Sequence, residues 1–507
     1  MTARHGLPLS NGDAVACRDV PQLAIGEFRD FVVGHVAGGD RIAAFFGVPR
    51  DCGTTRLLAV LACGETGSLS VTSTDVHDAY PALTPDCPQA HWFERELAEQ
   101  WAVRPQGHPW LKPLRFHRSY RPGRDAWDRA DGDPLLPGVT DFFRVEGEEV
   151  HEVAVGPVHA GVIEPGHFRF QCHGETVFHL EISLGYQHRG IERALAGGPS
   201  SRTIHFMETL AGDTTIGHAT AYCQNLEALA GCAVPARAAA IRGIALELER
   251  MANHAGDLGA LAGDVGYLPT QSFCGRLRGD LLNLTASLCG SRFGRGLVRP
   301  GGVGFDIDAD RGVRICDRLQ DTMRDLTAAV NLLWTSASVL TRFEETGVVP
   351  RRTAVELGLV GVVARASGLD RDARYDLPAG VFRTSQIPVS TSESGDVFAR
   401  AWVRWLELQR SAAFLQEQFR TLPEGAARSP CPPGEPDHLA VSVVEGWRGE
   451  LCHVALTDGA GRLAWYKIVD PSFHNWMGLA LALRGEEISD FPLCNKSFNL
   501  SYCGHDL

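Results

Sequence analysis

The chain from about residue 150 onward is dominated by apolar residues that recur at steps of three and four. In one long segment the repeat comprises Ile241, Ile244, Leu248, Met251, Ala255 and Leu258, and in the next it comprises Cys316, Leu319, Met323, Leu326, Val330 and Leu333. Such spacing lines one face of an α-helix, so both segments are predicted to be core helices of a bundle. A third helix is predicted from Val397 to about Phe419. Apolar alternation within 438–473 predicts two or three strands joined at the turn TDGAGR.

The first part of the chain has a different pattern. Short apolar runs such as RIAAFFGV and RLLAVLACG alternate with glycine and aspartate, and HWFERELAEQWAV follows with helical spacing, which predicts a small α+β domain over residues 1–118. Residues 119–149 are rich in proline, glycine, aspartate and arginine and have no periodicity, as in a linker. The predicted fold class is therefore α+β: a small N-terminal α+β domain, then over 150–507 a mainly α-helical bundle domain with small β elements at its two ends.

Charge and hydropathy exclude several kinds of partner. The net charge is -13 without any basic run, which argues against binding to nucleic acid. No segment approaches the roughly 18 uninterrupted apolar residues of a membrane span, and the first residues lack the apolar region of a signal peptide. We expect the chain by itself to be neither secreted nor membrane-spanning, so any membrane contact is expected to go through partner subunits.

The cysteines argue against a metal centre of the usual kind. There are 14 of them, and no CxxC pair exists. Structural zinc, iron–sulfur and nickel–iron sites commonly take two thiolates from one turn, because such a pair fixes half of the coordination shell at low entropic cost. We therefore interpret most of these cysteines as buried small apolar residues.

Four ionisable residues occupy one stripe of the first long helix. Glu247, Arg250, His254 and Asp257 stand at steps of three, four and three, close to the apolar face. Spacing alone favours a solvated face with ion pairs along the helix. The alternative is a buried charged row that relays protons or couples conformations.

Histidines gather between residues 156 and 195. The segment GPVHAGVIEPGHFRFQCHGETVFHLEISLGYQHRGIERAL places His159 and His167 on either side of Glu164, which precedes a Pro-Gly pair. A single histidine is usually a structural residue. This density beside a carboxylate predicts a strand and turn that line a polar cavity.

Seven segments in one order resemble a known family. They are GPVHAGVIEPGHFRF, LGYQHRGIERAL, RGIALELERMANHAGDLGALAGDVGY, LVRPGGVGFDI, ARASGLDRDARYDLP, SGDVFARAWVRWLELQRS and EGWRGELCHVALTDGAGRLAWYKIVDPSF. Together, over about residues 151–507, they resemble the large subunit of membrane-bound group 4 nickel–iron hydrogenases and its relative, the large quinone-site subunit of respiratory complex I. The segment ERELAEQWAVRPQGHPWLKPLRF is similar to the small complex I subunit that formate-hydrogenlyase-type proteins carry fused ahead of the large one. The fused order favours the hydrogenase branch.

The resemblance locates a metal site whose ligands are missing. Hydrogenases of this family hold nickel and iron with four thiolates, from one CxxC in the first half and another near the C-terminus. With the register fixed at His218, the first pair falls at Ala211 and Thr214, and the second at Leu500 and Cys503. A soft-metal site does not survive the loss of three thiolates. The resemblance therefore implies no metal centre and no hydrogenase activity.

The same resemblance assigns roles to nearby polar residues. Glu164 stands where these hydrogenases place a proton-relaying glutamate, and with His167 it forms the predicted catalytic pair. A quinone cavity like that of complex I is implied near His159, His205, Asp213, His218 and Asp264, although the tyrosine that binds the quinone headgroup is absent. We expect a wet working cavity, large enough for a small ligand, between the Glu164 turn, the Asp213 loop and the C-terminal tail.

Three functions remain as alternatives. The first is a subunit of a membrane-associated, ion-translocating oxidoreductase complex that has lost hydrogen chemistry. The second is a quinone-reducing subunit of an NADH dehydrogenase of the complex I type, and the third is a scaffold without a ligand. The resemblance implies a partner with iron–sulfur clusters, membrane-embedded antiporter-like subunits, and a peripheral position on the cytoplasmic side of the inner membrane. It implies no cofactor bound by this chain, with quinone as the one small ligand to consider.

Overall fold

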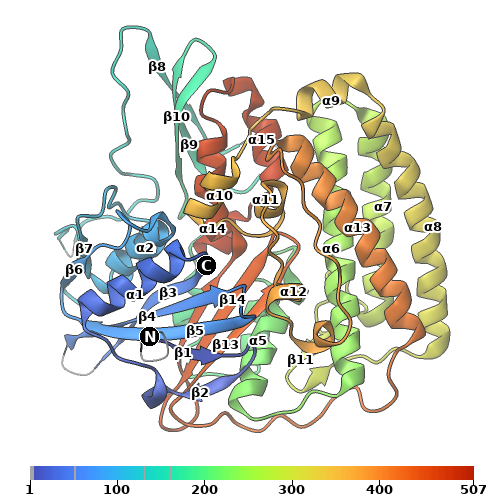
Figure 1. Ribbon diagram of the computed structural model, residues 1–507, viewed down its shortest axis with the longest axis horizontal. Helices are drawn as coiled ribbons and strands as arrows, with labels where there is room; N and C mark the ends of the chain where they lie inside the picture. Colours follow the sequence, from blue (N-terminus) through green and yellow to red (C-terminus); the bar gives the residue numbers. More distant parts are fainter. Residues whose placement is uncertain (1–4, 51–52, 131, 160–162) are drawn as a thin grey trace.

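The computed structural model describes residues 5–50, 53–130, 132–159 and 163–507 (Figure 1). Its N-terminal part is an antiparallel sheet with the strand order β1-β5-β4-β3. The strands are β1 (Leu7–Leu9), β3 (Arg41–Pro49), β4 (Thr55–Cys63) and β5 (Ser68–Val76), and the helices are α1 (Ile25–Ala37) and α2 (His91–Trp101). Strands β3 and β4 are buried along nearly their whole length, because α1, α2 and a second sheet all pack against this one.

The second sheet lies near the C-terminus and has the order β15-β14-β13-β2. It contains β2 (Ala14–Ala16), β13 (His438–Glu445), β14 (Glu450–Thr457) and β15 (Leu463–Val469). The N-terminal segment thus crosses from one sheet to the other, and Ala14 stands opposite Ala440. Apolar side chains of the two sheets form one continuous core. The division at 118 and 149 stays a prediction, and the structure adds that the two regions share this core.

Long helices form the bundle, in which α6, α7, α8 and α13 lie side by side (Figure 1). The bounds are α5 (Thr215–Leu229), α6 (Ala236–Asp264), α7 (Leu268–Cys289), α8 (Ala309–Trp334) and α13 (Val397–Arg420). The three helices predicted from apolar periodicity are α6, α8 and α13, and all three are confirmed. The predicted α+β fold class is confirmed as well.

A three-stranded antiparallel sheet of order β10-β9-β8 extends from the body at the top of Figure 1. It comprises β8 (Val150–Val155), β9 (His167–His173) and β10 (Thr176–Ser183). The described residues between β7 (Arg104–Gln106) and β8 contain neither helix nor strand, as the composition of 119–149 predicts. β7 itself pairs with β6 (Ala79–Pro81).

Short elements complete the chain and anchor its C-terminal tail. They are α3 (Ile191–Ala194), α4 (Thr203–Glu208), β11 (Val298–Arg299), β12 (Gly302–Val303), α9 (Ala337–Phe343), α10 (Arg351–Leu357), α11 (Gly361–Ala366), α12 (Ala373–Asp376), α14 (Pro471–Ala482), α15 (Phe491–Phe498) and α16 (Tyr502–Asp506). The carboxylate of Asp506 accepts backbone hydrogen bonds from Gly185 (2.8 Å) and Gln187 (2.9 Å), so the tail is fixed at the base of the three-stranded sheet.

Among the described residues, none of the helices is apolar and long enough to cross a bilayer.

Candidate functional site

Three segments that are far apart in the sequence meet near the C-terminus. The carboxylate of Glu164 accepts a hydrogen bond from the backbone N–H of Tyr502 at 3.3 Å, so the turn before β9 touches the tail. The guanidinium of Arg189 donates to the carbonyls of Leu210 (2.7 Å) and Cys503 (3.2 Å), which joins the loop before α5 to the same tail. The structure therefore brings together the turn, the loop and the tail that the sequence singles out. We refer to this meeting point as the convergence.

A second arginine holds the loop before α5. Arg448, in the turn between β13 and β14, donates to both carboxylate oxygens of Asp213, at 2.6 and 2.8 Å, and through Nε to the carbonyl of Asn499 at 2.6 Å. The guanidinium also lies over the ring of Trp447, 4.0 Å from its centre. Burial disfavours the ionised form of Asp213, but Arg448 outweighs it and holds the pKa of Asp213 below its usual value. Asp213 is thus an anion held in a bridge between loop and tail.

The four positions that the resemblance assigns to the nickel–iron ligands do not fit such a centre. Ala211 and Leu500 are buried apolar residues, and the Thr214 hydroxyl lies 3.3 Å from the bridging arginine. Cys503 supplies the one sulfur of this set. Burial, together with the carboxylate of Glu164, raises the pKa of Cys503 to about 11, so its thiol stays protonated. Because nickel and iron of this class need several thiolates, no chemical step is assigned to a metal.

Glu249, which the sequence analysis did not single out, is a buried carboxyl beside the same loop. Its oxygens accept backbone hydrogen bonds from Ile216 (2.7 Å) and Gly217 (3.2 Å) in the first turn of α5, where free N–H groups favour a negative charge. The amide of Asn253 donates to the backbone carbonyls of both Asp213 and Glu249, at 3.0 Å each. Burial nevertheless raises the pKa of Glu249 to about 8. This carboxyl can therefore exchange a proton near neutral pH.

His218 belongs to a fully buried chain of polar contacts. Its Nε2 lies 3.2 Å from a carboxylate oxygen of Asp470, and its Nδ1 lies 3.0 Å from Nε2 of His453, whose other nitrogen contacts the hydroxyl of Tyr466 at 3.0 Å. Burial keeps the pKa of His453 well below its usual value, so that ring is neutral. The chain links α5 to the C-terminal sheet.

The stripe of ionisable residues on α6 is buried, so the expectation of a solvated face is wrong. Glu247, Arg250 and His254 have no exposed surface, and Asp257 is 4% exposed. The physical reason is that α13 packs along this side of α6 with charges of its own, a fact that spacing within one helix cannot reveal. We refer to these four residues as the charged row.

The charged row pairs with residues from α11, α12, α13 and β13. Glu247 accepts hydrogen bonds from Arg250 (3.1 Å) and Arg374 (3.0 Å). Glu407, on α13, lies 2.9 Å from Nε2 of His254 and 2.8 Å from the guanidinium of Arg365. Burial opposes ionisation of Glu407, but Arg365 and the His254 hydrogen bond hold its pKa well below its usual value. The row and its partners Glu407, Arg365, Arg374, Asp372 and Glu445 are called the charged cluster below.

Asp257 connects the charged row to the tail. Its carboxylate pairs with Arg404 at 2.7 Å and accepts a hydrogen bond from the amide of Asn499 at 2.6 Å. The carbonyl of Asn499 is the group that binds Arg448. A single tail residue therefore touches both the charged row and the bridge to Asp213.

The remaining predicted site residues lie in different parts of the structure. His159 contacts the carbonyl of Gly166 at 2.9 Å, and His167 contacts the carbonyl of Gly156 at 3.2 Å, so both support the turn that carries Glu164. Asp264 is the last residue of α6 and is exposed. Of the five residues of the implied quinone cavity, His205 alone lines the cavity described next.

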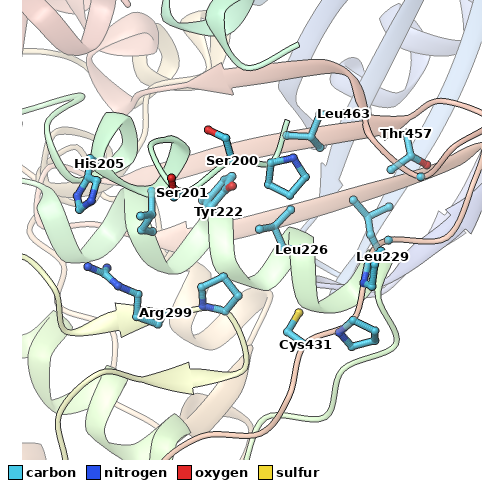
Figure 2. Close-up of a pocket in the computed structure, with 17 residues that line it drawn as sticks. Ser200, Ser201, His205, Tyr222, Leu226, Leu229, Arg299, Cys431, Thr457 and Leu463 are labelled. Carbon is cyan, nitrogen blue, oxygen red and sulfur yellow. The ribbon is translucent and has the colours of Figure 1, made fainter. Parts of the chain in front are cut away.

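His205 lines a separate cavity of about 450 Å³ beside α5 (Figure 2). Apolar side chains and prolines form most of its wall, with a few polar groups among them. The lining includes Pro199, Ile204, His205, Tyr222, Leu226, Leu229, Arg299, Cys431 and Leu463. A cavity of this size and polarity suits a small, largely apolar ligand.

Two comparisons with known proteins agree on the family to which the chain belongs. The family described as "Respiratory-chain NADH dehydrogenase, 49 Kd subunit" matches residues 264–435. Carbon monoxide-induced hydrogenase of Rhodospirillum rubrum is 32% identical over 352 residues, which cover 69% of this chain and 97% of that protein. The chain belongs to this family of large subunits, which hydrogenases and NADH dehydrogenases share.

Relatives from both branches are similar to the chain. Formate hydrogenlyase subunit 5 of Escherichia coli (strain K12) is 28% identical over 440 residues, covering 83% of this chain and 76% of that protein. NADH-quinone oxidoreductase subunit 4 of Thermus thermophilus is 29% identical over 369 residues, covering 68% of this chain and 90% of that protein. The formate hydrogenlyase subunit covers a larger share of this chain than the Thermus thermophilus subunit does.

Proposed function

We propose that this chain is a subunit of a membrane-associated oxidoreductase complex that couples electron transfer to ion translocation, without a nickel–iron site. The observation that carries the proposal is the buried charged cluster and its contact, through Asp257 and Asn499, with the bridge at Asp213. Charges buried this deeply cost several kcal/mol each unless they remain paired. A change of charge at one end of such a cluster therefore changes the ion pairs at the other end. Coupling of electron transfer to ion translocation requires an effect of this kind.

Catalytic roles are proposed for Glu164 and His167. Glu164 stands at the meeting point of turn, loop and tail and touches Tyr502. His167 contacts the carbonyl of Gly156 on one side and the guanidinium of Arg169 on the other, so it positions the turn. In this proposal Glu164 moves protons between the convergence and its surroundings, while His167 keeps it in place.

The partners and the location are proposed from the relatives. They include membrane-bound hydrogenase subunit alpha of Pyrococcus furiosus and NADH-quinone oxidoreductase subunit 4 of Thermus thermophilus, each named as a subunit of a larger enzyme. We assign the chain to the cytoplasmic face of the inner membrane, held there by membrane-embedded antiporter-like subunits. Electrons reach it from iron–sulfur clusters in a small partner subunit. We also propose that residues 1–118 act as a domain similar to the small complex I subunit, with 119–149 as linker.

The test is purification of the intact complex, followed by nickel and iron analysis, hydrogen-isotope exchange, and ion-translocation assays with a panel of electron donors and acceptors. We expect no nickel on this chain, no isotope exchange, and ion movement driven by electron transfer. Stoichiometric nickel would contradict the assignment. So would an assembled complex that transfers electrons and moves no ions.

A second candidate, quinone reduction, is favoured by the cavity at His205. Its apolar wall and single imidazole would suit the ring of a quinone, with the imidazole facing one carbonyl oxygen. A photoreactive quinone analogue tests this idea on the intact complex. Labelling of the peptides around His205 and Tyr222, lost in His205→Ala, would support it. Labelling confined to other subunits would refute it.

A further inference from the structure

A second and larger cavity, of about 910 Å³, opens between α5, α6, the segment after α12, and β13. Its outer wall is lined by small side chains of α6, including Ala236 and Ala239, and by exposed residues such as Arg383 and Glu417. None of the residues predicted to bind quinone lines it. The cavity is thus separate from the one at His205 and from the convergence at Glu164.

The inner wall of this cavity is formed by members of the charged cluster. Arg374 and Glu445 both line it, together with Leu246 on α6. Arg374 binds Glu247 at 3.0 Å, and Glu445 accepts hydrogen bonds from Arg365 at 2.8 Å and from the backbone N–H of Ala373 at 3.0 Å. The side chain of Glu445 is 2% exposed, so it stands at the boundary between the cavity and the protein interior.

We propose that this cavity is a water-filled entry to the charged cluster, and that Glu445 is the residue that exchanges protons between its water and the cluster. The inference rests on the proposed coupling function, to which it adds the route by which protons arrive. When the carboxylate of Glu445 takes a proton from a hydronium ion, a water molecule remains in the cavity. The ion pair with Arg365 then becomes a hydrogen bond between the charged guanidinium and a neutral carboxylic acid.

The consequence passes through Arg365, which stays charged throughout. Its guanidinium binds Glu445 and Glu407, and Glu407 contacts His254. Once Glu445 is protonated, it no longer shares the positive charge of Arg365 with Glu407. Arg365 then stabilises the Glu407 carboxylate more strongly, and this changes the affinity of His254 for a proton. The buried Nδ1 of His254 has no hydrogen-bond partner in the described part of the chain, so its protonation state responds to that field.

Charged groups from every neighbouring element face Glu445. They are Arg365 on α11, Asp372 and Arg374 at α12, Arg250 on α6, Glu450 directly opposite on β14, and, at longer range, Arg41 on β3 and Asp376 at the end of α12. Burial raises the pKa of Glu445, and Asp372 adds to this, while the arginines oppose it. The net upward direction brings the proton affinity of Glu445 closer to the pH of the surrounding water.

The first experiment measures whether water reaches the inner wall. Leu246→Cys and Leu248→Cys place a thiol at two buried positions on α6, of which Leu246 lines the cavity and Leu248 does not. In the intact complex we expect a small water-soluble thiosulfonate to label Leu246→Cys about tenfold faster than Leu248→Cys, as read by peptide mass spectrometry. Adding Ala239→Trp, which fills the cavity, should remove the difference. Equal labelling would overturn the proposal whether or not the complex moves ions.

The second experiment measures the role of Glu445. We expect Glu445→Gln to reduce ions moved per electron severalfold at normal assembly, Glu445→Asp to restore most of the ratio, and Ala239→Trp to slow translocation. Ala328→Trp, at an exposed position of α8 outside the cavity, is the matched control and should change nothing. Full translocation in assembled Glu445→Gln would overturn the role of Glu445. A wild-type complex that moves no ions would instead overturn the proposed function, with the labelling result unaffected.

Discussion

Arg448 binds both carboxylate oxygens of Asp213, at 2.6 and 2.8 Å, and in doing so ties the loop that carries Ala211 and Thr214 to the tail that carries Leu500 and Cys503. By the register predicted from the sequence, these are the two segments that metal–thiolate bonds would hold together in a hydrogenase. Here a salt bridge and the carbonyl of Asn499 make the connection. The geometry of the convergence therefore does not depend on a metal.

Asp213→Asn should weaken this connection. The amide keeps the shape of the side chain but leaves the buried guanidinium of Arg448 without its carboxylate, so we expect the free energy of unfolding to fall by about 2 kcal/mol. Chemical denaturation measures the change. Asp280→Asn, which breaks the exposed pair with Arg276, is the control and should cost less than about 0.5 kcal/mol. An equal effect of the two substitutions would contradict the structural role of the bridge.

The bridge also has a defined pH dependence. The folded-state pKa of Asp213 lies below its usual value. Its contribution to the free energy of unfolding is therefore fully present above the unfolded-state pKa of about 3.9, and it is lost as the pH falls through the lower folded-state pKa. The stability difference between wild type and Asp213→Asn should therefore be constant from about pH 5 to 8 and disappear in stronger acid. A difference that grows on acidification would show the opposite sign and refute it.

Glu249 should make the protein less stable as the pH rises. Its folded-state pKa is raised to about 8, so its stabilising contribution is complete in acid and is lost between the unfolded-state pKa of about 4.3 and that value. We expect a loss of about 1 kcal/mol per pH unit over this range, absent in Glu249→Gln, which is neutral at every pH. Denaturation at several pH values tests the slope. Glu175→Gln, at an exposed position, should keep the wild-type slope.

Glu247→Gln should separate coupling from folding. Glu247 holds Arg374, Arg250 and the hydroxyl of Ser411, and the amide retains the shape without the charge. We expect the complex to assemble while the number of ions moved per electron falls severalfold, because the paired charges transmit a change of charge through the charged cluster. Ion uptake in vesicles, normalised to electron transfer, is the measurement. Normal uptake in an assembled variant would reduce the charged row to a structural role.

Glu164 and Cys503 should differ in importance although they are neighbours. Glu164→Gln removes the carboxyl proposed to move protons and is expected to abolish turnover of the assembled complex. Cys503→Ser should be nearly silent, because a protonated thiol with no metal to bind has no chemical task. The comparison is made on complex activity at equal assembly. Loss of activity in Cys503→Ser with full activity in Glu164→Gln would reverse the assignment.

The helices could be predicted from the sequence because one face of each helix is buried, so that apolar residues recur with the period of the helix. The apolar repeats on α6 and α8, and the boundaries of α13, follow from local spacing. The environment of the ionisable stripe could not be predicted, since Glu247 and His254 are buried by contacts with other elements. One signal was present: Arg400, Arg404, Glu407 and Ser411 recur at steps of four, three and four on α13, a polar stripe that matches the one on α6.

The site was predicted where motifs align and missed where only folding brings residues together. The turn, loop and tail around Glu164 meet, but Glu249 and Arg448 were not singled out. Glu249 directly precedes Arg250 of the stripe but lies on another side of α6, and Arg448 lies in a turn distant in sequence from Asp213. Neither position carries a signal of spacing, because each acts through long-range contacts.

Strand β2 gives the protein an unusual order of maturation. It leaves the ribosome well before its pairing partner β13, which comes much later in the sequence. Until then the edge of β2 and the apolar face shared by the two sheets have no cover, although β3, β4 and β5 can already pair. A chain interrupted before His438 therefore displays an open strand edge beside an apolar surface, and those are features by which chaperones and proteases distinguish unfinished chains from finished ones.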